Sequence, residues 1–172
     1  MGSISGIETV FIRKAAEDVK LEKVRIKTLI DQMYGPKEYG LKDVSRLETV
    51  SFNFETRMPE ITKIISVGRY PWGGKMVRAD LASPYKTVTL TLNHIVFKVT
   101  LDGIFATQCG HLLRGQSVLV INGGSYDKGA SGKVGATEVK QMMFTKKTDC
   151  VYDIVTSHEN VILGNSVIVG SS

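Results

Sequence analysis

The side chains best suited to chemistry in this sequence are a cysteine, a histidine and an aspartate near the middle of the chain. Cys109 lies in the stretch TQCGH (residues 107–111), and His94 and Asp102 precede it. A cysteine protease brings a thiol nucleophile, a histidine base and a group that orients the base together from separate strands. Here His94 and Asp102 flank one expected strand at its opposite ends, and Thr107 stands where a Gly-x-Cys-Gly oxyanion turn requires glycine. We therefore expect no catalysis at Cys109, which we assign to the core.

Metal and phosphate sites also lack their usual patterns. The three histidines are isolated in the sequence and are expected at the surface or in turns, and Cys109 with His111 does not supply four ligands at structural-zinc spacing. The glycine-rich stretch 122–136 fails the phosphate-loop pattern, because Asp127 occupies the position of the first glycine and Val134 follows the lysine. We expect no catalytic residue, no metal and no cofactor, and we interpret residues 122–136 as a mobile connecting loop.

The strongest candidate for a binding site is the stretch RYPWGGK (residues 69–75). It holds the only tryptophan of the chain between two cations, in a context that favours turns. Aromatic rings beside Arg and Lys can stack on bases or lie at a lipid interface while the cations meet phosphates. Alternatively, Trp72 closes one end of the core. The residues predicted to bind nucleic acid or membrane through this surface are Arg57, Lys63, Arg69, Tyr70, Trp72, Lys75, Arg78 and Lys86.

Positive charge is concentrated in the same part of the chain. Residues 57–147 carry 13 Lys or Arg against five Asp or Glu, whereas the first 56 residues have nine of each. The chain from residue 148 onward has three acids and neither Lys nor Arg. Such a basic block favours contact with polyanions, either nucleic acid or an anionic membrane surface. Each exposed cation contributes roughly 1 kcal/mol near such a surface, so no single contact decides binding.

Alternation of apolar and polar residues predicts a β-rich chain after residue 46. The period of two is clearest in residues 47–56, 85–92 and 95–101. The apolar set changes from even to odd numbers across Asn93-His94, so a tight turn or a bulge must separate the last two strands. A short helix is expected over about 104–113. Further strands are predicted at 63–67, 76–81, 117–121, 137–144, 150–156 and 161–169.

The first 46 residues are predicted to form an N-terminal arm. Apolar residues near helical spacing favour a helix from about Ala15 to Met33, ended by the Tyr-Gly-Pro at 34–36, although residues 23–27 also alternate. Residues 47–172 are predicted to form a β-rich globular core. The expected fold class is α+β, a single β-rich domain with an antiparallel sheet or sheets and an N-terminal helix.

Cysteine usage and hydropathy bear on the location of the protein. Cys109 and Cys150 form no disulfide framework, so we expect free thiols and a reducing intracellular compartment. The first residues, MGSISGIETVF, lack a basic region followed by a long apolar run, so no signal peptide is expected. No apolar stretch approaches the roughly 18 residues that cross a bilayer. The expected location is cytoplasmic.

Two strand-like segments resemble segments of rhabdovirus matrix proteins. Residues 83–92, SPYKTVTLTL, are similar to a strand of that family in which Tyr-Lys precedes alternating Thr and apolar residues. Residues 50–57 resemble the Phe-rich strand that opens its core, and Pro59 follows as in the family. Small basic matrix proteins of plant-infecting members have about this length. The chain has no adjacent prolines and so lacks the Pro-Pro-x-Tyr budding motif of animal-virus members. The resemblance implies a protein that coats a helical ribonucleoprotein, self-associates and links it to an envelope, in the host cytoplasm and virion interior.

Together these observations predict a function without catalysis. We expect a structural assembly protein of matrix type that forms homo-oligomers. Its basic face is expected to bind a nucleoprotein–RNA assembly, an anionic membrane surface or both. The alternative is a monomeric β-barrel that binds single-stranded nucleic acid, with Tyr70 and Trp72 as the stacking platform. A third possibility, an enzyme whose site the sequence does not reveal, stays open.

Overall fold

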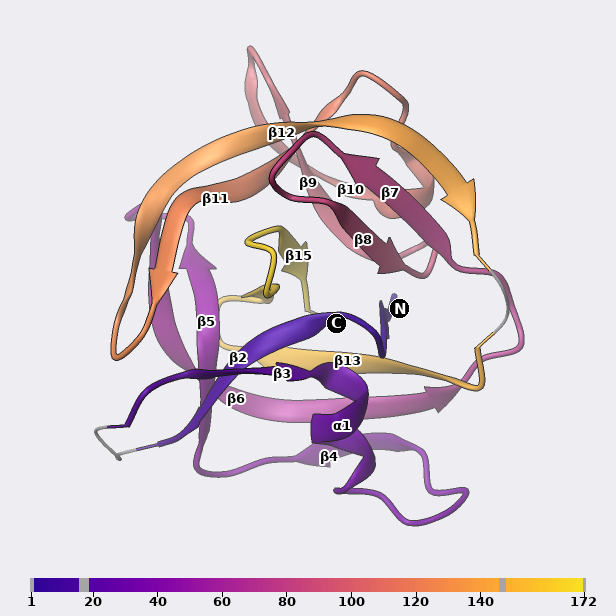
Figure 1. Ribbon diagram of the computed structural model, residues 1–172. Helices are drawn as coiled ribbons and strands as arrows, with labels where there is room; N and C mark the ends of the chain where they lie inside the picture. Colours follow the sequence, from indigo (N-terminus) through magenta and orange to yellow (C-terminus); the bar gives the residue numbers. More distant parts are fainter. Residues whose placement is uncertain (1, 16–18, 146–147, 172) are drawn as a thin grey trace.

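The computed structural model describes residues 2–15, 19–145 and 148–171, and their regular structure is almost entirely antiparallel strand. Figure 1 shows the strands curling into a half-barrel, with the long β12 arching over one side and β6 and β13 crossing the other. The helical elements are the short α-helix α1 (Ile26–Asp31) and the 3-10 turn η1 (Cys109–His111). The strands are β1 (Ile4–Ser5), β2 (Thr9–Lys14), β3 (Glu22–Arg25), β4 (Gly40–Asp43), β5 (Leu47–Asn53), β6 (Met58–Pro71), β7 (Val77–Leu81), β8 (Thr87–Leu90), β9 (Ile95–Thr100), β10 (Gly103–Gln108), β11 (Ser117–Tyr126), β12 (Ala130–Phe144), β13 (Cys150–Thr156), β14 (Asn160–Ile162) and β15 (Ile168–Gly170).

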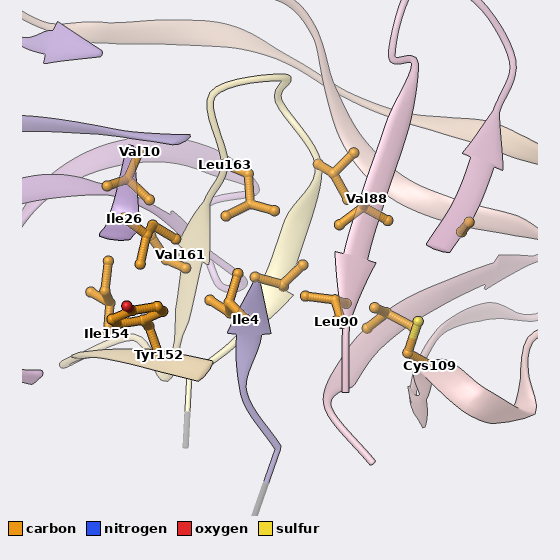
Figure 2. Packing of buried hydrophobic residues seen from close by; sticks show 14 of the residues in the cluster. Ile4, Val10, Ile26, Val88, Leu90, Cys109, Tyr152, Ile154, Val161 and Leu163 are labelled. Carbon is orange, nitrogen blue, oxygen red and sulfur yellow. The ribbon is translucent and has the colours of Figure 1, made fainter. Parts of the chain in front are cut away.

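Most strands lie on one path, which runs β14-β15-β9-β11-β12-β7-β8-β1-β13-β6-β5-β2-β3, while β10 pairs with β9 and β4 pairs with β6 outside it. The hydrophobic core lies inside this curl, and Figure 2 shows Ile4 of β1 between Leu90 of β8 and Tyr152 of β13. All three side chains are almost completely buried. Burial of one large apolar side chain is worth roughly 1.5–3 kcal/mol, so Ile4 anchors the start of the chain in the middle of the sheet.

The alternating strands predicted from the sequence are present. Residues 47–56, 85–92 and 95–101 contain β5, β8 and β9, and the single β-rich domain is confirmed. The change of face at Asn93-His94 is a tight turn, in which the His94 N–H donates to the Thr91 carbonyl at 3.1 Å. Val88 and Leu90 of β8 are buried as predicted, but the predicted buried face of β9 is wrong in part, because Val96 is buried and Ile95 is exposed.

The predicted helix from Ala15 to Met33 is largely wrong, and residues 16–18 lie outside the described part of the chain. Within the rest of that range only α1 is α-helical, and Glu22–Arg25 form β3, with Val24 opposite Val10 of β2. The alternation in residues 23–27 was the better guide, because pairing with a neighbouring strand overrides a weak helical spacing. β1 and β2 pair with β8, β13 and β5, so these strands of the first 46 residues join the same sheet as the rest. The division into an N-terminal arm, residues 1–46, and a core, residues 47–172, stays a prediction.

Two further expectations are wrong. The helix expected over 104–113 is β10 followed by η1, because β10 pairs with β9 along its whole length. The connecting loop expected at 122–136 is the end of the β11–β12 hairpin. Its glycines serve the hairpin: Gly132 has φ 141°, and a Cβ there would lie 2.4 Å from Ile121 Cγ2. Another glycine, Gly123, lies in a bulge between Asn122 and Ser125 and has φ 65°.

Two properties of the described residues bear on the expected location. They contain no helix that is both long and apolar enough to span a bilayer. Cys109 and Cys150 are both free thiols, as predicted.

Candidate functional site at the two chain ends

Both ends of the chain meet at the turn between β8 and β9. β1 lies antiparallel to β8, with Ile4 opposite Leu90, so the residues before Ile4 reach the end of β8. β15 lies antiparallel to β9, with Val169 opposite Val96, so the residues after Val169 reach the start of β9. Figure 1 shows the N and C labels close together inside the half-barrel. The sheet pairing therefore brings the first and last described residues to one short segment, residues 91–94.

Thr91 makes three hydrogen-bond contacts with the backbone of Ser3. The Ser3 N–H donates to Thr91 Oγ1 at 2.8 Å, and the Thr91 N–H donates to the Ser3 carbonyl at 2.9 Å. Thr91 Oγ1 also lies 3.2 Å from that carbonyl and 2.9 Å from Asn93 Oδ1, and its single proton can serve either acceptor. Since Thr91 is 1% exposed and Ser3 is 6% exposed, water does not compete for these bonds. The amide nitrogen of the Gly2–Ser3 bond is thus fixed against a hydroxyl that can both accept and donate.

His94 holds the other end of the chain. Its Nε2 lies 2.6 Å from the carbonyl oxygen of Gly170. A carbonyl oxygen only accepts, so Nε2 carries the proton in this bond. Burial lowers the pKa of His94 below its ordinary value, and contacts with the backbone of Gly2 and Gly170 oppose this effect. In the neutral ring Nδ1 then keeps a free lone pair, and this buried atom has no hydrogen-bond partner among the described residues.

Glycine is required on both sides of the histidine. A Cβ on Gly2 would lie 2.1 Å from the Cα of His94, and a Cβ on Gly170 would lie 2.9 Å from the Cβ of Ile95. Side chains at these positions would push the chain ends away from the ring. Two Gly–Ser peptide bonds, Gly2–Ser3 and Gly170–Ser171, therefore flank one imidazole. The cavity beside them has a volume of about 320 Å³ and is lined by Gly2, Asn93, His94, Ile95, Gln108, Gly170 and Ser171.

A buried carboxyl group supports the N-terminal side of the site. The Thr89 N–H donates to Glu8 Oε2 at 2.9 Å, which ties β8 to the segment that follows β1. Burial raises the pKa of Glu8 to about 7, although the bond from Thr89 lowers it in part. Glu8 therefore titrates near neutral pH. It lies five residues after Ser3 in the chain, and its hydrogen-bond partner Thr89 lies two residues before Thr91.

The sequence analysis singled out His94 and Cys109, and the structure gives them different roles from those tested there. Cys109 packs in the core as expected, and burial raises the pKa of its thiol to about 12, so it is not a nucleophile at neutral pH. It supports the site through its backbone, since its N–H donates to the His94 carbonyl at 2.8 Å. The expectation that His94 is an ordinary surface or turn histidine is wrong in part, because it stands at a turn but is 1% exposed.

Sequence reasoning missed Ser3, Thr91, Gly170 and Ser171. One local signal was available: Thr91 lies three residues before a histidine, where the apolar face changes. The serines carried no signal of their own, because only the pairing of β1 and β15 with distant strands brings them to that histidine.

The residues predicted to bind polyanions are spread over β6, β7 and two turns. Arg69 pairs with Asp31 at 3.4 Å, and Arg78 pairs with Asp80 at 2.9 Å. Lys63 lies opposite Glu48 in the β5–β6 ladder. Each of these cations therefore has an acidic neighbour.

The remaining members of the set lie at turns or beside aromatic rings. Trp72 Nε1 donates to the Lys75 carbonyl at 3.4 Å, and Lys75 Nζ stands 5.2 Å from the centre of the Phe144 ring. The hydroxyl of Tyr70 is buried. Arg57 and Lys86 adopt positive φ at the β5–β6 and β7–β8 turns. The structure thus brings Trp72 and Lys75 together and distributes the others along the sheet.

Comparisons with known proteins bear on the fold. No family profile and no curated protein matches this sequence. Solved structures match it along its whole length at low identity. An intein from a hyperthermophile matches with 15% identity over 99% of this chain and 100% of that chain, with a TM-score of 0.80. The transcription factor IIB Mvu mini-intein matches with 17% identity over 98% and 100%, with a TM-score of 0.81. The KlbA intein precursor from Methanococcus jannaschii matches with 16% identity over 100% and 92%, with a TM-score of 0.79.

These matches overturn the functional expectations drawn from the sequence. The resemblance to rhabdovirus matrix proteins rested on about two strands, whereas the similarity to inteins covers the whole chain. The assembly protein without catalysis and the nucleic-acid-binding barrel are therefore both wrong, and so are the partners expected for them: further copies of the chain, a nucleoprotein–RNA assembly and an anionic membrane. The virion interior loses its basis as a location. The fold of this chain is the intein fold, and the site formed by Thr91, His94 and the two chain ends lies inside it.

Proposed function

We propose that this chain is a self-processing domain of the intein type, which acts on its own Gly2–Ser3 peptide bond. Inteins catalyse their own protein splicing while embedded in a host precursor. The observation that carries the proposal is the buried hydrogen bond from the Ser3 N–H to Thr91 Oγ1 at 2.8 Å, next to His94. A serine, a hydroxyl partner and a histidine are the residue types that acyl transfer uses.

The reaction we propose is an acyl shift from nitrogen to oxygen. Ser3 Oγ attacks the carbonyl carbon of Gly2, a C–O bond forms and the C–N bond breaks. The hydroxyl proton ends on the Ser3 nitrogen, so the product is an ester between Gly2 and Ser3 Oγ with a free α-amine. Nucleophile and electrophile are neighbours in one chain, so no encounter is needed and the favourable geometry is built in. Water or another nucleophile can then cleave the ester.

Thr91 and His94 have distinct roles in this step. While the bond is an amide, Thr91 Oγ1 accepts the Ser3 N–H and orients the peptide plane. As the nitrogen becomes an amine, the same hydroxyl can donate to its new lone pair. The free lone pair on His94 Nδ1 can take up the serine proton and return it to the leaving nitrogen, which is general acid–base catalysis. Burial of both residues keeps water away from the bond until the ester has formed.

The shift is tested with hydroxylamine at neutral pH, because this reagent cleaves esters far faster than amides. We expect the full chain to lose the residues before Ser3, as measured by intact mass. Ser3→Ala abolishes the loss, and Ser3→Cys makes it faster and inducible by thiols, because a thioester replaces the ester. Ser5→Ala is the matched control, since Ser5 is a buried serine two residues further along the chain, in β1, at 7% exposure. Equal loss from the wild type and a folded Ser3→Ala variant would contradict the proposal.

A further inference from the structure

A cavity away from the chain ends carries positive charge and no negative charge. It has a volume of about 380 Å³ and is lined by residues of β3, the β7–β8 turn, the bulge of β11 and the turn between β14 and β15. Its lining includes Lys23 and Lys86 and contains no Asp or Glu. We propose that this cavity binds a small phosphorylated molecule, whose phosphate group is held by the two lysines. The proposal does not depend on the proposed function, because none of the lining residues belongs to the site at the chain ends.

The backbone at Lys86 is fixed in an unusual conformation. Lys86 has φ 65°, a left-handed value that lysine rarely adopts and that costs free energy. Asn165 holds the residues on both sides of it, since its Nδ2 donates to the carbonyls of Tyr85 and Thr87, each at 2.9 Å. The Lys86 carbonyl itself accepts from the Leu81 N–H at 2.7 Å. Backbone strain of this kind is concentrated at sites that bind ligands, and here it fixes the position from which the Lys86 side chain reaches the cavity.

Lys23 reaches the same cavity from β3, across a glycine. A Cβ on Gly164 would lie 2.8 Å from Lys23 Cε, so the missing side chain leaves room for the lysine stem. Lys23 Nζ lies 5.9 Å from the centre of the Phe11 ring, a distance at which the ring attracts the ammonium group only weakly. Neither Lys23 nor Lys86 makes an ion pair within residues 2–15, 19–145 and 148–171. Both ammonium groups are therefore available to an anion.

The bulge of β11 adds polar backbone to the lining. Pairing with β12 is regular up to Asn122 and resumes at Ser125, so the ladder is interrupted at Gly123 and Gly124. Gly123 has φ 65°, and a Cβ at this position would meet no atom within 4 Å, so it faces open space. Successive backbone N–H groups in turn-like segments of this kind form concavities that bind anions. The bulge therefore places polar backbone groups at the wall of the cavity, beside the two lysines.

The charge and the size of the cavity define the class of ligand. Two lysines supply two positive charges with several N–H donors each, which match a phosphate dianion better than the single charge of a carboxylate. Small-molecule sites have volumes of roughly 300–1,000 Å³, so a cavity of about 380 Å³ accommodates an organic group besides the phosphate. Pro84, Tyr85 and Ile121 offer apolar surface to that group. We therefore expect a phosphate monoester with a small aromatic or aliphatic group to bind in preference to free phosphate.

The experiment titrates the full chain with phenyl phosphate at neutral pH and measures binding by isothermal titration calorimetry. Inorganic phosphate and phenol are titrated in parallel at the same ionic strength, because screening by salt weakens contacts between exposed charges. We expect phenyl phosphate to bind more tightly than inorganic phosphate, and phenol not to bind. Lys23→Gln and Lys86→Gln should each weaken the binding of phenyl phosphate about fivefold, as expected for exposed ion pairs. The double variant should weaken it about 25-fold, because separate contacts are nearly additive.

Lys37→Gln is the matched control. Lys37 is also an exposed lysine with left-handed backbone, at φ 59°, and it does not line the cavity. The affinity for phenyl phosphate should not change in this variant. Circular dichroism spectra identify the variants that are folded, and only these are compared.

Three outcomes would overturn the proposal. No saturable binding of phenyl phosphate at millimolar concentration would exclude the site. Binding that is unchanged in the folded double variant, or weakened equally by Lys37→Gln, would show attraction by the general positive charge of the chain. Equal affinity for inorganic phosphate and phenyl phosphate would contradict the assignment of an ester and identify free phosphate as the ligand. None of these results depends on release of the residues before Ser3, which is measured separately.

Discussion

The two Gly–Ser bonds of this chain have the same sequence and meet at the same turn, but the fold holds them by opposite ends of the peptide group. At Gly2–Ser3 the described support is on the nitrogen, where the N–H donates to the Thr91 hydroxyl at 2.8 Å. At Gly170–Ser171 the support is on the carbonyl, which accepts from His94 at 2.6 Å, while the N–H meets only a backbone carbonyl. The peptide nitrogen is thus held by a side chain at one bond and the carbonyl oxygen at the other.

The antiparallel sheet explains this difference. β1 pairs with β8, so the first bond lies where β8 ends, at Thr91. β15 pairs with β9, so the last bond lies where β9 begins, beside His94. Thr91 and His94 are three residues apart on one turn. Thr91 follows β8 and lies beside the first described residues, whereas His94 precedes β9 and lies beside the last ones. Two residues on a single turn therefore hydrogen-bond to two Gly–Ser peptide groups that are 168 positions apart in the sequence.

The largest expected effect is that of His94→Ala. A positioned acid–base group contributes about 10²–10⁴ in rate, so we expect a loss of that size in release before Ser3. Some release should remain, because Thr91 still holds the nitrogen. The measurement is the rate of the hydroxylamine product by intact mass. Release at the wild-type rate, in a variant that keeps the wild-type circular dichroism spectrum, would contradict the role of His94.

Thr91→Val is expected to have the complementary and smaller effect. The substitution keeps the shape of the side chain and leaves the Ser3 N–H buried without its acceptor, a cost of about 1–3 kcal/mol. We expect about a 10-fold slowing of release before Ser3. Thr91→Ser retains the hydroxyl and is the matched control. Release at the wild-type rate from a folded Thr91→Val variant would contradict the assignment.

The smallest effect on the reaction is expected from Glu8→Gln, which should change the pH dependence of stability. The pKa of Glu8 is raised from 4.5 to about 7 in the folded chain, so the folded state binds the proton more tightly than the unfolded state. Its contribution is present below pH 4.5 and is lost as the pH rises through 7, up to about 3 kcal/mol in total.

The glutamine keeps an oxygen that can accept the Thr89 N–H and does not titrate. Urea unfolding of the wild type and the variant between pH 4 and pH 8 measures the difference. The variant should lose less free energy of unfolding over that range. Parallel curves would show that Glu8 does not titrate as its burial implies.

The sequence predicted the local structure best where alternation was strong. The burial of Val50 and Phe52 and the positions of the strands on either side of Asn93 follow from residue spacing, although the buried face of β9 does not. It failed for β3 and for the glycine-rich hairpin. In both places a partner strand supplies the stabilisation, and spacing within one segment does not identify that partner.

By itself the sequence determined a β-rich chain, a tight turn at Asn93-His94 and the absence of a thiol suited to catalysis at Cys109. The tertiary structure alone decided that His94 is the centre of the site. Ser3 and Ser171 are ordinary serines in the sequence, and only the fold places them beside the turn that holds the buried His94. That arrangement comes from strand pairing between residues about 70 to 90 positions apart, on both sides of His94. Such long-range pairing is specified by the whole core, so the local sequence around the paired residues does not reveal it.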